Sequence, residues 1–296
     1  MEKNRYNGTI QILFSTSLWG TALVYSRYII EMGFPSKDVV SLKLLFGFIA
    51  LLIYILIKNP LLLKIDKGGI FHALSLGIFC HALYNLFMFL TIDSTNIATA
   101  VALLYTSPIF VMIMSRIFFR EKINGLKIFA LILAVMGIYF TVTNGDSSNI
   151  LISKKGLITG LASGFTFALS TIISKASVAK YRQETILMYT FLFAFIFSLL
   201  FSNPMEFLNR NYNPLVYFFI IMLGVLSTAI SYLFYLNGLK LGVPSSKASI
   251  ISTLEVPISV IGEVLIFKDE LLFWKILGIV LIMISIFLIN YENFRH

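Results

Sequence analysis

The sequence predicts an all-α membrane protein with ten transmembrane helices, arranged as two inverted five-helix repeats. Of its residues, 58% are hydrophobic and 12% are charged, whereas about a quarter are charged in an average soluble protein. One apolar segment also occurs twice, in residues 108–121 and 257–270. A chain built from two copies of one apolar unit is typical of transporters, because many of their folds consist of internal repeats.

The two copies share the spacing of their polar residues as well as their apolar character. Pro108 and Glu121 correspond to Pro257 and Glu270 at one constant offset. With small shifts in offset, the match extends to Gly8, Leu13, Ser15 and Ser26, which correspond to Gly156, Leu161, Ser163 and Ser174. Chance similarity between apolar helices is the alternative, but Pro and Glu stand outside the Leu, Ile and Phe background of such helices.

Apolar runs long enough to cross a bilayer as helices, about 17 to 25 residues each, occur throughout the chain. We predict spans at residues 9–27, 39–57, 70–90, 97–115, 126–144, 156–174, 185–203, 214–236, 246–266 and 274–291. Five spans fall in each half, and the polar turn residues 144–149 lie between the halves. This pattern predicts a first repeat in residues 1–145, a linker in 146–155 and a second repeat in 156–296.

Lys and Arg residues are unevenly distributed between alternate loops. With the N-terminus inside, the inside loops include the basic segments 58–67, 116–122 and 175–182, and the outside loops hold fewer basic residues. The positive-inside rule then predicts a multi-pass protein of the cytoplasmic membrane with both termini in the cytoplasm. Because five is odd, the second repeat enters the membrane with opposite polarity, which predicts a central site at the repeat interface near the midplane.

Motifs of other function classes are missing from the sequence. It has no His-Glu-x-x-His, no Gly-x-Ser-x-Gly and no Gly-rich phosphate loop ending in Lys-Ser or Lys-Thr. It has one Cys and three His, too few for a disulfide framework or a Cys-based zinc site. We therefore expect no enzyme activity, no cofactor and no metal. The expected partners are a small-molecule substrate and the lipid bilayer, with no nucleic acid; the sequence indicates no oligomeric state.

Several motifs of the sequence resemble those of a known family. They are the Pro of the fourth helix in each half with the Glu that follows it, Trp19-Gly20 in the first helix, and Ser252-Thr253-Leu254-Glu255-Val256-Pro257 in the ninth. With ten spans, they resemble the ten-helix EamA-type branch of the drug/metabolite transporter superfamily. The resemblance implies a proton-linked or passive exporter of small metabolites, with the first four helices of each half around a central cavity and helices five and ten at the periphery. The family often has Glu directly before this Pro, whereas Val256 separates the two here.

Glu255 is the leading candidate for a functional residue. An ionisable group inside a span costs about 3 kcal/mol on insertion scales, so its presence suggests a function. We predict it in the middle of the ninth helix, with Ser252, Ser259 and Gly262 on the same face. There it is expected to carry a coupling proton or to bind an amine; a structural hydrogen bond to a neighbouring helix is the alternative.

The other candidates for contact with substrate are one basic residue and several aromatic and amide residues. Lys43 is expected either to meet a substrate carboxylate or to extend to the membrane surface. Aromatic rings with polar tips suit an amphipathic solute, although they also suit helix packing. These residues are Trp19, Tyr84, Asn85, Tyr105 and Tyr232. We expect His81 to serve packing, and Glu121 and Glu270 to fix loop geometry.

The sequence therefore predicts a secondary transporter that exports small amphipathic metabolites, such as amino acids or related compounds, across the cytoplasmic membrane, with a proton as the candidate coupling ion. An importer or facilitator of the same superfamily is the first alternative. A membrane receptor or scaffold that transports nothing is the second.

Overall fold

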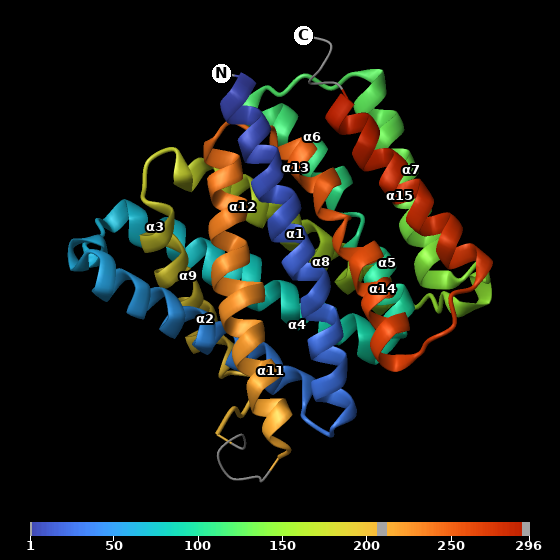
Figure 1. Cartoon of the computed structure of the whole chain (residues 1–296), viewed down its shortest axis with the longest axis horizontal. Helices are drawn as coiled ribbons and strands as arrows, with labels where there is room; N and C mark the ends of the chain where they lie inside the picture. The colour runs from blue at the N-terminus through green and yellow to red at the C-terminus, as the bar shows by residue number, and fades with distance from the viewer. Residues whose placement is uncertain (1, 206–211, 292–296) are drawn as a thin grey trace.

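The chain folds into a bundle of membrane-length helices in the computed structural model, which describes residues 2–205 and 212–291 (Figure 1). The first half contains α1 (Glu2–Glu31), α2 (Ser36–Lys58), η1 (Pro60–Leu63), α3 (Lys67–Ser75), η2 (Leu76–Ala82), α4 (Leu83–Ser94), α5 (Ile97–Leu104), α6 (Ser107–Phe119) and α7 (Gly125–Thr143). The second half contains η3 (Ser147–Asn149), α8 (Lys154–Val178), α9 (Gln183–Ser198), α11 (Pro214–Gly224), η4 (Val225–Ile230), α12 (Ser231–Lys240), α13 (Ser245–Ser252), α14 (Glu255–Phe267) and α15 (Phe273–Tyr291).

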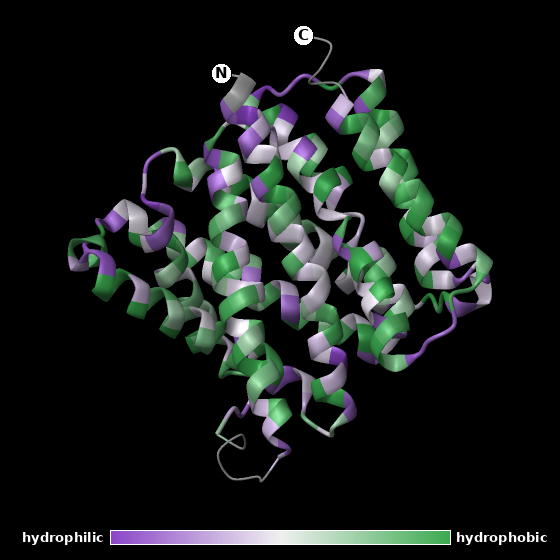
Figure 2. Cartoon of the chain, in the orientation of Figure 1, coloured by the Kyte–Doolittle hydropathy of each residue, from purple (hydrophilic) through white to green (hydrophobic). Residues whose placement is uncertain are grey.

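Most of these elements combine into spans that are long and apolar enough to cross a membrane. Within the described residues, 8 spans meet both criteria, and α9 is a shorter apolar helix. The long helix α1 is more polar than these spans and makes the tenth. Apolar side chains such as Ile57 and Phe287 are 82% and 67% exposed, and hydrophobic residues predominate along most of the helices (Figure 2). Their contact with water would cost about 25 cal/mol per Å², a cost that lipid removes. The predicted all-α membrane fold is confirmed.

The first helices of the two halves run in opposite directions. The described ends of the chain, Glu2 and Tyr291, lie on the same side of the molecule, which we call the terminal face (Figure 1). Helix α1 starts on this face. Helix α8 starts on the opposite face, where Gly156 packs against Thr95. The two repeats are therefore inverted relative to each other, as predicted.

The fifth helix of each half lies at the edge of the bundle. In Figure 1, α7 and α15 run side by side along one edge. Gly137 and Gly278 allow this contact, because a Cβ added to Gly137 would lie only 2.7 Å from the carbonyl oxygen of Gly278. Ser285 also donates a hydrogen bond of 2.6 Å to the carbonyl of Ala130 across the pair. The eight remaining spans therefore form the centre of the bundle.

The fourth and ninth spans are broken near their middles, whereas the sequence predicts continuous helices at 97–115 and 246–266. Helix α5 ends before Tyr105, and α13 ends before Thr253. Pro108 and Pro257 follow each break and explain it, because Pro has no N–H to donate and its ring clashes with the carbonyl four residues earlier. Glu255 lies near the middle of the span Ser245–Phe267, as predicted, but it is not inside a continuous helix. Glu255 is the first residue of α14.

The third and eighth spans also depart from regular α-helix. Each contains a π-helical segment, η2 in the third span and η4 in the eighth. In η4, the Thr228 hydroxyl donates a hydrogen bond of 2.9 Å to the carbonyl of Leu223. Single-turn π segments frequently occur at functional sites. The two segments lie at corresponding places in the repeats, and both contribute side chains to the cavity described next.

Candidate functional site

A cavity lies between the two repeats. Together with the space that opens to solvent, its empty volume is about 810 Å³. Its walls come from α1, α2, α5, α8 and α14 and from the two spans that contain η2 and η4. We call it the central cavity.

All the residues that the sequence marks as candidates for substrate contact line the central cavity: Trp19, Lys43, Tyr84, Asn85, Tyr105, Tyr232 and Glu255. The structure thus brings together side chains from both repeats that are up to 236 positions apart in the numbering of the chain. Whether they contact a solute stays a prediction. The wall also includes residues that the sequence does not single out for binding, among them His81, Phe167 and Thr228.

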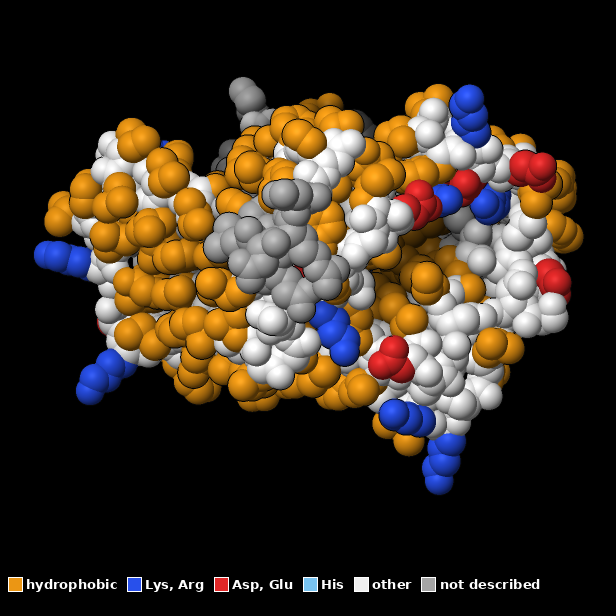
Figure 3. Space-filling view, turned by 90° about the horizontal axis from the view of Figure 1, so that it is seen from below, with side chains coloured by type: hydrophobic (Ala, Val, Ile, Leu, Met, Phe, Trp, Pro, Cys, Tyr) orange, Lys and Arg blue, Asp and Glu red, His pale blue; other side chains and the backbone are white. Residues whose placement is uncertain are grey.

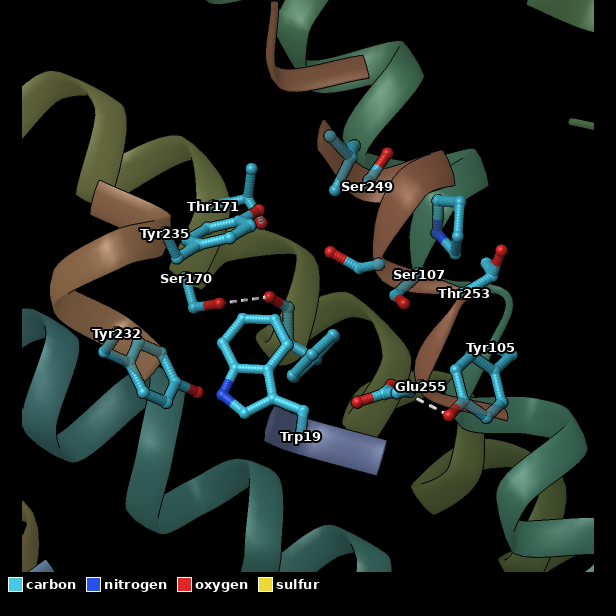
Figure 4. A pocket seen from close by; sticks show the side chains of 14 residues that line it. Trp19, Tyr105, Ser107, Ser170, Thr171, Tyr232, Tyr235, Ser249, Thr253 and Glu255 are labelled. Atoms are coloured by element: carbon cyan, nitrogen blue, oxygen red, sulfur yellow. Dashed lines mark hydrogen bonds between the residues drawn. The ribbon is translucent and has the colours of Figure 1, made fainter. Parts of the chain in front are cut away.

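The side chain of Glu255 connects the two broken spans. Its Oε1 atom accepts a hydrogen bond of 2.8 Å from the Tyr105 hydroxyl (Figure 4). Tyr105 follows the last residue of α5, and Glu255 opens α14. The helix breaks determine where both side chains point, since in a continuous helix their directions would follow the regular helical spacing. The carboxylate is half-buried and faces the cavity.

Lys43 brings a basic group to the same cavity from α2. Its side chain is half-buried. Among the described residues, no hydrogen bond or ion pair joins it to Glu255. An acid and a base therefore share one cavity without pairing directly. Such an arrangement is costly unless water or a ligand compensates both charges.

Aromatic rings form much of the remaining wall. The ring centroids of Trp19 and Tyr232 are 4.9 Å apart with an interplanar angle of 56°. His81 packs edge-on against Tyr232 at 5.0 Å, and Tyr84 contacts Phe167 at 5.3 Å. His81 thus packs as the sequence predicts, but it also faces the cavity. Phe167 is one of 28 Phe residues, and no sequence signal distinguishes it.

A smaller pocket adjoins the central cavity (Figure 4). The two share Trp19, Tyr105, Phe167, Tyr232 and Glu255. Beyond these shared residues, hydroxyl groups predominate: Ser107, Ser170, Thr171, Ser249, Ser252 and Thr253. In Figure 4, Trp19 lies between Tyr232 and the Tyr105–Glu255 pair. The Trp19 indole therefore lies where the smaller pocket meets the central cavity.

The terminal face is closed by contacts of Glu121, which lies two residues after the end of α6 and which the sequence assigns to loop geometry. Its carboxylate accepts hydrogen bonds from Lys175 Nζ at 2.7 Å and from the backbone N–H groups of Ser245 and Ser246 at 2.7 and 3.1 Å. The Ser246 hydroxyl donates another at 2.6 Å. Glu121 thus binds the N-terminus of α13, in the other repeat. Burial raises the pKa of this carboxyl, but the hydrogen bonds from Lys175 and Ser246 outweigh burial and leave the pKa below its ordinary value.

The opposite face is hollowed. Figure 3 shows a depression there, with hydrophobic side chains inside it and charged side chains at its rim. The central cavity extends toward this face, because its lining includes Leu23 and Ser26 in the last part of α1. The structure therefore represents a state that is closed at the terminal face and open at the opposite face.

Comparison with known proteins decides the family. The model of the EamA-like transporter family matches residues 7–143 and again 154–291. This chain belongs to the EamA-like transporter family. The match confirms the resemblance seen in the sequence and the two repeats. It also identifies this EamA-like chain as a multi-pass membrane transporter rather than an enzyme.

Individual relatives of this EamA-like transporter are consistent with that assignment. The chain is 27% identical over 294 residues to the uncharacterized inner membrane transporter YicL of Salmonella typhimurium, an alignment that covers 97% of this chain and 96% of that protein. It is 31% identical over 189 residues to an uncharacterized transporter of Archaeoglobus fulgidus, covering 62% of this chain and 61% of that protein. One solved crystal structure has the same fold, with a TM-score of 0.82 and 15% identity over 97% of this chain and 98% of that one.

Proposed function

We propose that this EamA-like transporter is a secondary transporter that exports small amphipathic amino compounds, such as amino acids or related metabolites, across the cytoplasmic membrane. The observation that carries this proposal is the presence of Glu255 and Lys43, unpaired with each other, in one aromatic-walled cavity between inverted repeats. A zwitterion offers each charge a partner. Its amine suits Glu255, and its carboxylate suits Lys43.

The aromatic wall supports a cargo with an apolar portion. Trp19, Tyr84 and Tyr232 present ring surface for such a group, and ring faces also attract ammonium groups. Their polar tips, together with the Asn85 amide, supply hydrogen bonds that fix orientation. A lining of aromatic rings with a few polar groups is typical of small-molecule sites.

Proton coupling is the proposed driving force, with Glu255 as its carrier. A carboxyl group that binds an amine in its charged form releases that amine more readily once it is protonated. Protons that enter through the open face would then displace the cargo from Glu255, and the empty carrier would return with the proton. This sequence of steps moves cargo outward while protons move inward.

The direction of export depends on the orientation of the chain. We propose that the terminal face lies in the cytoplasm, as the loop charges indicate, so that the central cavity opens to the outside in this state. The name of the Salmonella relative, an inner membrane transporter, supports placement in the cytoplasmic membrane.

The experiment that tests this function is transport by purified protein in proteoliposomes. We would use three probes with one phenyl group each: phenylalanine, phenethylamine, which lacks the carboxylate, and 3-phenylpropionate, which lacks the amine. We expect counterflow of phenylalanine to exceed that of both others. Lys43→Gln should remove the advantage of phenylalanine over phenethylamine, whereas Lys37→Gln, an exposed residue on the same helix, should preserve it.

Two outcomes would contradict the proposal. Proteoliposomes that move none of the probes, nor any member of a wider panel of amino compounds, would favour a receptor or scaffold. Cargo that moves in the same direction as the protons under an imposed proton gradient, into the compartment that corresponds to the cytoplasm, would favour an importer.

A further inference from the structure

Glu121 and Glu270 occupy the same place in the two repeats, yet their surroundings differ. Each follows the last helix turn of a broken span, α6 for Glu121 and α14 for Glu270. Glu121 binds Lys175 and the N-terminus of α13 in the other repeat. Glu270 is exposed and, among the described residues, has no hydrogen-bond or ion-pair partner. One copy of this carboxylate is therefore engaged and the other is free.

The helix starts that correspond to each other differ in the same way. The repeat places Asn96 and Ile97, at the start of α5, where Ser245 and Ser246 stand at the start of α13. Ser245 and Ser246 are 0% and 1% exposed, whereas Ile97 is 67% exposed. The Asn96 side chain caps its own helix by accepting a hydrogen bond of 2.8 Å from the Thr99 backbone N–H. The start of α5 thus lacks the carboxylate from the other repeat that the start of α13 has.

The basic partner also has a counterpart. Arg27 lies near the end of α1, where the repeat places Lys175 near the end of α8. Lys175 binds Glu121, but Arg27 binds Asp269, the neighbour of Glu270, with a distance of 3.1 Å between Nη2 and Oδ1. Arg27 also bonds to Glu31 in its own helix. Because Glu270 is the next residue after Asp269, Arg27 would have to move its ion pair by only one residue to bind Glu270.

We propose that Glu121 and Glu270 are alternating latches: when the opposite face closes, Glu270 binds the N-terminus of α5 and takes Arg27 from Asp269, while Glu121 releases α13 and the terminal face opens. The inference rests on the proposed transport cycle only in assuming that both faces open in turn. Its physical basis is that free N–H groups at a helix N-terminus bind carboxylates. The inverted repeat supplies a corresponding carboxylate, helix start and basic residue at each face.

The latches can be tested by the accessibility of single cysteines. Cys80 is the only cysteine in the chain, so Cys80→Ala gives a cysteine-free background. Ile97→Cys reports the opposite face and Ser245→Cys reports the terminal face. The Ser245 hydroxyl has no partner among the described residues, so this substitution leaves the Glu121 contacts in place. Labelling with a hydrophilic maleimide in detergent reaches both faces and needs no substrate, and the result is therefore independent of whether the proposed cargo is correct.

The two latch variants should act in opposite directions. Glu121→Gln weakens closure of the terminal face, so labelling at position 245 should rise and labelling at position 97 should fall, each by about fivefold or more, as expected for two sites coupled through one equilibrium. Glu270→Gln should do the reverse, with higher labelling at position 97 and lower at 245. Glu263→Gln, which neutralises another carboxyl, in the helix α14 that precedes Glu270, is the matched control and should change neither.

Two results would overturn the proposal. If Glu121→Gln exposes position 245 without protecting position 97, Glu121 is only a local helix cap. If Glu270→Gln leaves both positions unchanged in protein that still transports, Glu270 is not a latch. Absence of transport together with the expected labelling would instead count against the proposed cargo and leave the latches in place.

Discussion

Tyr105 and Glu255 are joined by a hydrogen bond of 2.8 Å across the boundary between the repeats, at the point where the fourth and ninth spans are both broken. The bond links a group that can carry a proton to the helix break of the other repeat. A change in the charge of Glu255 therefore acts on both broken spans at once. Under the proposed function, this arrangement would connect proton or amine binding at Glu255 to movement between the repeats.

Removal of the Tyr105 hydroxyl should weaken this link without unfolding the protein. Tyr105→Phe keeps the ring, and a hydrogen bond to a charged group contributes about 1.5–3 kcal/mol, so we expect the apparent affinity or rate of transport to fall by roughly tenfold or more. The abundance of the variant in the membrane should remain near that of the wild type. Tyr139→Phe, on the peripheral helix α7, is the control. Equal transport by both variants would show that the bond has no functional role.

Neutralisation of Glu255 should separate gradient-driven transport from exchange. Glu255→Gln keeps the size of the side chain and much of its hydrogen bonding, but it cannot titrate. We expect flux driven by a pH gradient to fall strongly, whereas counterflow at equal pH falls less. Parallel measurements of both fluxes in proteoliposomes check this. Gradient-driven flux that is unchanged in well-inserted Glu255→Gln protein would rule out the coupling role and leave a structural hydrogen bond.

Alanine substitutions in the cavity wall should have graded effects. Tyr84 contacts Phe167, whereas Tyr232 contacts Trp19, His81 and Phe191. We therefore expect Tyr84→Ala to reduce apparent substrate affinity at near-normal abundance, and Tyr232→Ala to lower abundance as well. Asn85→Ala should resemble Tyr84→Ala. Immunoblots of membranes beside transport assays distinguish the two effects, and loss of protein in all three variants would favour a packing role for this wall.

Parts of this architecture were predictable from the sequence because they depend on composition and repetition. Apolar run lengths determine the spans, and the paired Pro and Glu residues reveal the repeat. The seven candidate residues could be selected because polar and aromatic groups are costly or unusual inside a span. Their meeting in one cavity followed from the predicted geometry of inverted repeats, not from any local pattern.

Other features depend on contacts between distant residues and were not predictable. Pro108 and Pro257 interrupt their spans, but periodicity alone did not show that the breaks would put Tyr105 beside Glu255. Glu121 was assigned to its own loop because its charged neighbours in sequence suggested local pairing. Its actual partners, Lys175 and the start of α13, lie far along the chain and became visible only in the structure.

The orientation of the chain can be tested directly. Loop charges predict that both termini lie in the cytoplasm and the 145–155 linker outside. A reporter protein fused after residue 296 should therefore give a cytoplasmic signal, and a cysteine introduced in the linker should react with an impermeant reagent in intact cells. A periplasmic signal from the C-terminal reporter would reverse the proposed direction of export, because the cavity would then open inward in the present state.

The contact between Glu121 and α13 should persist at neutral pH and fail in acid. The pKa of Glu121 in the folded protein lies below its ordinary value of 4.5, so the stabilisation from its hydrogen bonds is fully present above that ordinary value. It is lost as the pH falls through the lowered folded pKa. Labelling of Ser245→Cys, measured with a reagent whose reactivity is corrected for pH, should stay constant from about pH 5 to 8 and rise only below that range. A pH dependence of transport near neutrality would then arise from a group other than Glu121. A rise in Ser245→Cys labelling between pH 6 and 7 would contradict this division of roles.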